Sequence, residues 1–244
     1  MSNEILRPES LQPAANKFCP GCLHPMSLKL MMQSLEELGI AKKAVMVVAV
    51  GCSTMELTCL KIDMISVAHG RAPAVATGIK RVQPETFVFT YQGDGDLASI
   101  GLSEILCAAN RGERFSVIFA NNSTYGMTGG QLAPTSLVGQ VTTTTPLGRN
   151  ADVDGYPINM CDLISQFKAP SYIARCALNS PANVVKAKAS IKKAFQNQLE
   201  GKPFSFVELL TNCPTNWHLS PLDSLKHIED ASIPNFPLGI FRDR

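Results

Sequence analysis

Two hydrophobic runs, each followed by small polar residues, constrain the fold of this chain more than any other feature. The run 86–91 leads into a Gly-Asp-Gly-Asp sequence at 93–96, and the run 115–120 leads into an Asn-Asn pair. Both runs are typical of buried strands that end in loops, with a helix between them. Asp94 and Asn122 should therefore meet at the carboxyl edge of a parallel sheet, where open α/β folds bind ligands.

The chemistry of these residues indicates a metal-assisted phosphate site. Carboxylate and amide oxygens suit a hard cation such as Mg²⁺, which usually keeps phosphate oxygens in its shell. We expect Asp94 and Asn122 to bind such an ion through their side chains, and Thr124 through its backbone carbonyl. Gly93 and Gly95 let backbone N–H groups approach the phosphate. The alternative is a pair of ordinary turns, because turns use Gly and Asp everywhere.

Alternating strand and helix patterns indicate an α/β fold with a doubly wound, mostly parallel sheet. Further strands are expected at 44–50, 171–177 and 204–210, and helices at 26–38, 71–82, 97–110, 161–167 and 181–200. No repeat or low-complexity linker divides the chain, so 1–244 is expected to form a single domain. An N-terminal cysteine loop (about 16–24) and a C-terminal segment (about 213–244) should pack on it.

Composition excludes several classes of protein. The net charge is +2 and no basic cluster stands out, so we expect no nucleic-acid partner. No apolar segment is long enough and free enough of charge to span a membrane, and the N-terminus lacks the apolar core of a signal peptide. We therefore expect a cytoplasmic protein. Its eight cysteines should then be buried, metal-bound or catalytic rather than disulfide-bonded.

Four of the cysteines fall in expected loops. Cys19 and Cys22 form a C-x-x-C pair that, taken alone, fits a zinc site, a redox dithiol or an iron–sulfur site. No strand pattern precedes Cys19, which argues against a thioredoxin-like dithiol. Cys52 and Cys213 follow expected strands at the edge that carries Asp94, so one tetrathiolate site for Zn²⁺ or [4Fe–4S] is conceivable. The others are interpreted as small core residues: Cys59, Cys107, Cys161 and Cys176.

Two further features are expected at the same sheet edge. His69 follows the strand-like segment 64–68, and a structural and a catalytic role are equally consistent with its position. The loop 125–131 contains several glycines that allow close backbone approach. We expect this loop, including Tyr125 and Gly126, to form a pocket wall; the alternative is a surface loop.

With these motifs assembled, the chain resembles the β subunit of the 2-oxoacid:ferredoxin oxidoreductases. The resemblance covers nearly the whole chain and is carried by the motifs at 18–22, 50–54, 69–78, 93–96, 121–122, 125–131 and 213–217. Several motifs in the same order are far more specific than any one of them.

The resemblance implies that the chain carries thiamine diphosphate, Mg²⁺ and a [4Fe–4S] cluster. It selects the cluster over zinc, with Cys19, Cys22, Cys52 and Cys213 as its ligands. It assigns Asp94, Asn122 and the Thr124 carbonyl to Mg²⁺. The implied cofactor contacts are Gly51, Cys52, Ser53, His69, Gly93, Asp94, Gly95, Asp96, Asn122, Tyr125 and Gly126.

The implied reaction is the oxidative decarboxylation of a 2-oxoacid to acyl-CoA and CO₂, with electrons passed through the cluster to ferredoxin. The implied partners are an α subunit that supplies the carboxylate activating the cofactor, further ferredoxin-like and γ subunits, ferredoxin, and coenzyme A. The segment 115–148 has no Lys or Arg. That favours a branched substrate such as 2-oxoisovalerate over 2-oxoglutarate, whose second carboxylate calls for a cation. Arg149 or the α subunit could supply that cation.

Two alternatives remain open. A non-redox thiamine decarboxylase or synthase would need no tetrathiolate site and would normally carry both cofactor-binding domains on one chain. A zinc-stabilised scaffold subunit would have the thiol groups but no catalytic role.

Overall fold

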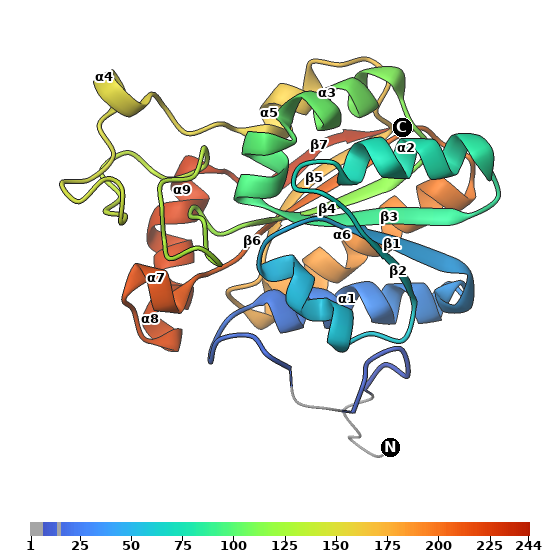
Figure 1. Cartoon of the computed structure of the whole chain (residues 1–244), viewed down its shortest axis with the longest axis horizontal. Helices are drawn as coiled ribbons and strands as arrows, with labels where there is room; N and C mark the ends of the chain where they lie inside the picture. The colour runs from blue at the N-terminus through green and yellow to red at the C-terminus, as the bar shows by residue number, and fades with distance from the viewer. Residues whose placement is uncertain (1–6, 14–15) are drawn as a thin grey trace.

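A computed structural model of the chain describes residues 7–13 and 16–244 (Figure 1). Its strands are β1 (Ala44–Val48), β2 (Asp63–Ser66), β3 (Phe87–Gly93), β4 (Ser116–Asn121), β5 (Tyr172–Ala177), β6 (Ser205–Leu210) and β7 (Gly239–Asp243). They form one seven-stranded sheet in the order β2-β1-β3-β4-β6-β5-β7. All neighbouring pairs in this spatial order are parallel except the last, in which β7 is antiparallel to β5 at the edge of the sheet. The expected mostly parallel sheet is therefore confirmed.

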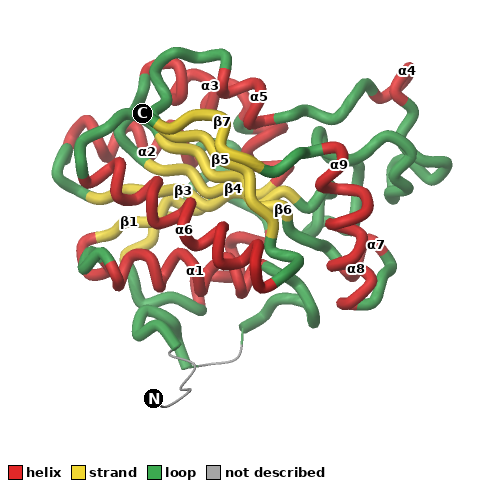
Figure 2. Tube along the Cα trace, turned by 180° about the vertical axis from the view of Figure 1, so that it is seen from behind, coloured by secondary structure: helices red, strands yellow, loops and turns green. Residues whose placement is uncertain are grey.

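Helices cover both faces of the sheet (Figure 2). They are α1 (His24–Glu37), α2 (Ala72–Val82), α3 (Leu102–Arg111), α4 (Ala151–Asp154), α5 (Met160–Ser165), α6 (Pro181–Leu199), α7 (Pro214–Trp217), α8 (Pro221–His227) and α9 (Ile233–Asn235). α1 and α6 pack on one face, where Phe89 and Val207 point, and α2, α3 and α5 pack on the other, where Val88 and Phe206 point. Because successive strand residues face opposite sides, a sheet covered on both faces needs continuous apolar runs.

The helix expected at 97–110 does not begin as an α-helix. A π-helical turn, Gly95–Ile100, comes first, and α3 follows it. Here the backbone passes very close to another segment: a Cβ on Gly70 would lie 2.6 Å from the backbone nitrogen of Gly101. Wide turns of this kind occur frequently at functional sites.

The interpretation of Cys107 as a core residue is wrong, because this side chain is exposed. The buried stripe of α3 consists of Ile105, Ala108 and Ala109, and position 107 points away from it. The other three cysteines interpreted as core residues, Cys59, Cys161 and Cys176, are buried as expected.

The elements beyond residue 213 are short helices and an edge strand, which no periodic sequence pattern indicates. α7, α8 and α9 pack beside the carboxyl ends of the central strands (Figure 1), and strand β7 returns along β5. β7 is largely exposed, so its sequence lacks the apolar run that marks the inner strands. No helix among residues 7–13 and 16–244 is both long and apolar enough to cross a membrane.

Candidate active site

A cavity lies at the carboxyl edge of the sheet, where β1 and β3 end. From β1 the chain crosses to β2 on one side, and from β3 it crosses to β4 on the other side. The loops after β1 and β3 therefore diverge, and such switch points are where open α/β folds bind ligands. The cavity is lined by His24, Val50, Gly51, Cys52, Ser53, His69, Gly93, Asp94, Gly95, Asp96, Asn122, Thr124, Tyr125, Gly126, Met127 and Thr128. This lining includes every residue that the sequence analysis places around the cofactor.

Asp94 is one of two buried acids that line the cavity, and Asp96 is the other. Its Oδ1 accepts a hydrogen bond from the backbone N–H of Asn122 at 3.1 Å, and its Oδ2 accepts one from the hydroxyl of Thr135. Burial raises the pKa of Asp94 from 3.8 to about 7, because the ionised form loses its hydration. A cation placed here would favour the ionised form, so the site suits a metal.

The loop after β4 presents further oxygen atoms beside Asp94. Ser123 has a φ of 57°, in the left-handed region, and the residues on either side of it, Asn122 and Thr124, both line the cavity. An amide oxygen and a backbone carbonyl are ligands that Mg²⁺ accepts. Within the described ranges, no three His, Cys, Asp or Glu side chains are grouped to hold a metal ion. This absence does not test the predicted Mg²⁺ site, because Asp94 is the one predicted ligand whose side chain is of those types.

Asp96 lines the cavity, and its carboxylate is held by hydrogen bonds from neighbouring groups of the chain. Its Oδ1 accepts from Nδ1 of His69 at 2.7 Å and from the backbone N–H of Gly70 at 2.6 Å. Its Oδ2 accepts from Nε2 of Gln92 at 2.5 Å. An imidazole fixed through one nitrogen presents the other in a defined direction. Asp96 stays a predicted cofactor contact, and these hydrogen bonds show that it also orients His69.

Several groups in the cavity fit a diphosphate. The Ser53 hydroxyl is buried and has no hydrogen-bond partner in the part of the chain that the structure describes. A buried hydroxyl without a partner is costly, so a phosphate oxygen would satisfy it. Gly95 lies directly against the ring of Tyr125, where an added Cβ would come within 2.1 Å of a ring carbon. Only glycine fits there, so the backbone and the Tyr125 ring can both line the cavity at this point.

The cavity shares a wall with the loop thiols. A Cβ on Gly126 would lie 3.2 Å from Sγ of Cys52, 3.7 Å from Sγ of Cys213 and 3.6 Å from Nδ2 of Asn122. Burial, and then the neighbouring thiols, raise the pKa of Cys22 to about 11 and that of Cys52 to about 12. Cys19 and Cys213 are among those neighbours for both residues. The structure therefore brings the four predicted ligand thiols into one region, although no three of them, among the described residues, are grouped closely enough to hold a metal ion.

Two asparagines that the sequence analysis did not identify hold these loops. Oδ1 of Asn212 accepts from the N–H of Leu23 at 3.0 Å, and its Nδ2 donates to the carbonyl of Gly21 at 3.0 Å, tying the C-x-x-C loop to the segment of Cys213. Nδ2 of Asn216 donates to the carbonyl of Gly126 at 2.8 Å and to Sγ of Cys213 at 3.2 Å. Asn216 lies within the 213–217 motif, but neither residue belongs to a local pattern that indicates a hydrogen bond to a distant loop.

Arg149 is not a ligand-facing cation. It is only 5% exposed. Its guanidinium donates to backbone carbonyls of its own loop, those of Ala133, Pro134, Ser136, Asp154, Gly155 and Tyr156. The suggestion that Arg149 supplies charge to a substrate is therefore wrong. Instead it holds together the long loop that also positions Thr135 on Asp94.

Comparison with known proteins points to one family. Residues 49–209 match the thiamine pyrophosphate enzyme family, C-terminal TPP binding domain. The whole chain is 44% identical to ketoisovalerate oxidoreductase subunit VorA of Methanothermobacter thermautotrophicus, covering 54% of that protein. Over 88% of the chain it is 35% identical to 2-oxoglutarate synthase subunit KorB of Methanocaldococcus jannaschii, covering 78% of it. The chain thus spans about half the length of the VorA relatives.

A solved structure agrees. The 2-oxoglutarate:ferredoxin oxidoreductase from Magnetococcus marinus, with 2-oxoglutarate, coenzyme A and succinyl-CoA bound, matches with a TM-score of 0.81 at 25% identity. The match covers 99% of this chain and 86% of that one. The chain therefore belongs to the thiamine pyrophosphate enzyme family, among the subunits of the 2-oxoacid:ferredoxin oxidoreductases.

Proposed function

We propose that this chain is the β subunit of a 2-oxoacid:ferredoxin oxidoreductase and carries thiamine diphosphate, Mg²⁺ and a [4Fe–4S] cluster. The reaction is the oxidative decarboxylation of a 2-oxoacid to acyl-CoA and CO₂ in the cytoplasm, with electrons passed to ferredoxin. One observation carries the proposal: an added Cβ on Gly126 would lie within 4 Å of the Asn122 amide and of the sulfurs of both Cys52 and Cys213. A phosphate-type cavity and a group of thiols thus share one wall.

The residues of the cavity have distinct roles in this proposal. Asp94, Asn122 and the Thr124 carbonyl hold Mg²⁺, and the metal in turn holds the diphosphate. Ser53 donates its free hydroxyl to the diphosphate, and Gly51, Gly93 and Gly95 allow close approach of the backbone. Asp96 holds Nδ1 of His69 and so fixes the orientation of an imidazole that lines the cavity. When bound, thiamine diphosphate acts as the electron sink for decarboxylation.

The thiols of Cys19, Cys22, Cys52 and Cys213 bind the cluster. Deprotonating four neighbouring thiols is unfavourable without a cationic group, because the thiolates repel one another. An iron–sulfur cluster supplies that charge and is typically held by four cysteines. Nδ2 of Asn216 donates a hydrogen bond to Sγ of Cys213. This bond would tune the reduction potential of the cluster, because hydrogen bonds to the sulfurs are one of its determinants.

The substrate is proposed to be a branched 2-oxoacid, with 2-oxoisovalerate favoured over 2-oxoglutarate. No Lys or Arg occurs among the described residues that line the cavity, and Arg149 is bound to its own loop. A second substrate carboxylate would be left without a cation from this chain. The more similar relative, VorA, is also the one named for ketoisovalerate.

The partners are an α subunit that provides the activating carboxylate, further ferredoxin-like and γ subunits, ferredoxin itself, the 2-oxoacid and coenzyme A. The test is anaerobic purification with the co-purifying subunits, followed by assay against a panel of 2-oxoacids with coenzyme A and ferredoxin. We expect a brown protein that reduces ferredoxin and prefers 2-oxoisovalerate.

The alternatives give different results in the same experiment. A colourless protein that decarboxylates without reducing ferredoxin would identify a non-redox thiamine enzyme. A zinc-loaded protein whose complex keeps full activity after Asp94→Ala would identify a scaffold subunit.

A further inference from the structure

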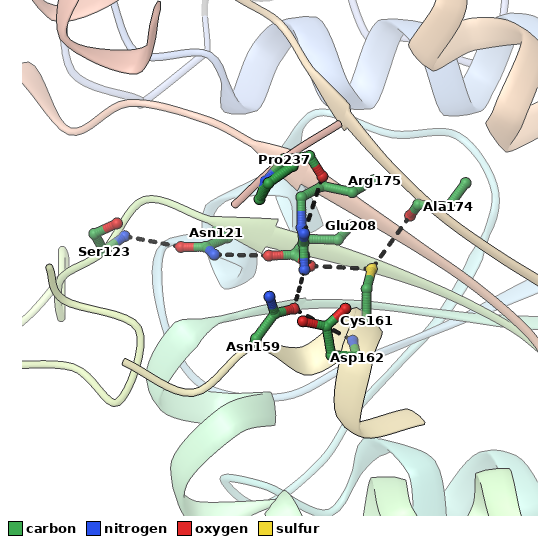
Figure 3. A network of polar contacts seen from close by, with 9 residues as sticks. All are labelled: Asn121, Ser123, Asn159, Cys161, Asp162, Ala174, Arg175, Glu208 and Pro237. Carbon is green, nitrogen blue, oxygen red and sulfur yellow. Dashed lines mark hydrogen bonds and ion pairs between the residues drawn. The ribbon is translucent and has the colours of Figure 1, made fainter. Parts of the chain in front are cut away.

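A buried polar network runs from the central strands to the loop that follows β4 (Figure 3). Arg175 on β5 and Glu208 on β6 are register partners, and Nε of Arg175 donates to Oε2 of Glu208 at 2.8 Å. Both side chains are completely buried. Asn121, the last residue of β4, donates from Nδ2 to Oε1 of Glu208 at 2.7 Å. The Cys161 thiol also donates to Oε2 at 3.2 Å, so the Glu208 carboxylate joins a cation and a thiol to the residue that begins the loop.

Asn121 connects this network to the loop backbone. Its Oδ1 accepts the N–H of Ser123 at 3.1 Å, closing a turn in which Ser123 has a φ of 57°. Residues other than glycine rarely adopt this conformation unless a local hydrogen bond supports it. The conformation of Ser123 sets where Asn122 and Thr124 lie relative to Asp94. One amide side chain therefore joins the buried carboxylate to the geometry of the predicted metal ligands.

The Arg175–Glu208 pair has no contact with the cavity, because neither residue lines it. Arg175 instead donates to the carbonyl of Pro237 at 3.0 Å and to Oδ1 of Asn159, and its guanidinium lies over the ring of Phe236. A buried ion pair adds little stability beyond that of apolar residues of similar size. Fixing the direction of the Glu208 carboxylate, and with it the Asn121 amide, gives the pair a role that apolar residues could not fill.

We propose that Asn121, oriented by Glu208 and Arg175, is a positioning residue for the metal-binding loop and thereby sets the affinity for Mg²⁺ and for thiamine diphosphate. The inference rests on the proposed function, since it takes Asn122 and Thr124 as Mg²⁺ ligands. Partners that orient metal ligands typically change metal affinity by about 10- to 100-fold when they are removed.

The test measures the Mg²⁺ concentration that half-saturates thiamine diphosphate binding, by calorimetry on the full chain with its co-purifying subunits. Asn121→Ala should raise this concentration at least about tenfold. Asn159→Ala is the matched control: it is the same substitution in the same network, at a side chain that bonds to Arg175 and to the N–H of Asp162. It should lower the melting temperature and leave the Mg²⁺ requirement within about twofold of wild type, because the hydrogen bonds of the Asn159 side chain go to Arg175 and Asp162 and not to Asn121 or Ser123.

A graded variant makes the test independent of folding problems. Asn121→Ser loses the contact to Glu208 but can still accept the Ser123 N–H weakly, so its Mg²⁺ requirement should lie between those of wild type and Asn121→Ala. If Asn121→Ala does not fold, the comparison of Asn121→Ser with wild type decides. An unchanged requirement in the folded Asn121 variants, or an equal rise in Asn159→Ala, would overturn the positioning role.

Asp94→Asn separates this inference from the proposed function. If Asp94→Asn abolishes Mg²⁺-dependent binding while the Asn121 variants bind normally, only the positioning role fails. If wild type itself shows no Mg²⁺-dependent binding of thiamine diphosphate, the proposed function fails.

Discussion

Replacing Asp94 by Asn should stabilise the ligand-free protein while removing its metal site. The buried carboxyl has a pKa near 7, against 3.8 for the ordinary group. One pKa unit corresponds to about 1.4 kcal/mol, so ionising Asp94 in the folded protein costs about 4 kcal/mol more than ionising it in the unfolded chain. An asparagine of the same shape has no ionised form. Its Oδ1 can still accept the N–H of Asn122, and its Nδ2 can donate to the hydroxyl of Thr135.

The sign of the pH dependence follows from linkage. Because the folded state holds the Asp94 proton more tightly, wild-type stability falls as pH rises between about 4 and 7 and then levels off. The advantage of Asp94→Asn should therefore grow from about 2 kcal/mol at pH 5 to about 4 kcal/mol at pH 8. For a chain of this length that corresponds to roughly 10 °C in melting temperature at pH 8.

The assay is urea unfolding of both proteins from pH 5 to pH 8, in chelator and then with Mg²⁺ and thiamine diphosphate. Added ligands should stabilise wild type and leave Asp94→Asn unchanged, since binding to the folded state raises its stability by mass action. Asp152→Asn, at an exposed position, is the control and should shift stability by less than about 0.5 kcal/mol. The reasoning is refuted if Asp94→Asn is less stable than wild type at pH 8, or if its advantage does not grow with pH.

Three further substitutions test other parts of the site. Ser53→Ala should weaken thiamine diphosphate binding about tenfold by calorimetry, because a hydrogen bond to a charged group is lost; a large loss of stability would contradict the absence of a partner for this hydroxyl. Arg149→Met should leave the carbonyls of residues 133–156 without their donor, and faster cleavage of this loop in limited proteolysis would show it; unchanged cleavage would contradict the clamp. Cys52→Ser should abolish bound iron and visible absorbance, whereas Cys107→Ser should keep both, as measured by iron analysis; equal iron in the two variants would count against the ligand assignment.

Local patterns predicted the inner part of the fold closely. The runs at 86–91 and 115–120 became β3 and β4 because strands covered on both faces must be apolar throughout. The π-helical turn and β7 were not predicted. The first depends on a close approach to Gly70, and the second is an exposed strand that gains its hydrogen bonds from β5.

Polar residues inside the strands were harder to interpret. Arg175 and Glu208 lie in segments that read as ordinary apolar strands, and neither residue alone indicates a buried ion pair. Their contact exists because β5 and β6 are neighbours with these two positions in register. Register is a property of the assembled sheet, so only the structure reveals that this pair is joined to Asn121, at the start of the loop that lines the cavity.

The sequence by itself determined the strand–loop–helix order and the chemistry of each loop, because burial patterns and turn preferences depend on residues close together in the chain. Tertiary structure decided what those loops do together. It placed the sulfurs of Cys52 and Cys213 together beside Gly126, and it tied the loop of Leu23 to Asn212 across nearly 190 positions of sequence. Contacts of that range follow from strand order and crossover direction, which only the folded chain specifies.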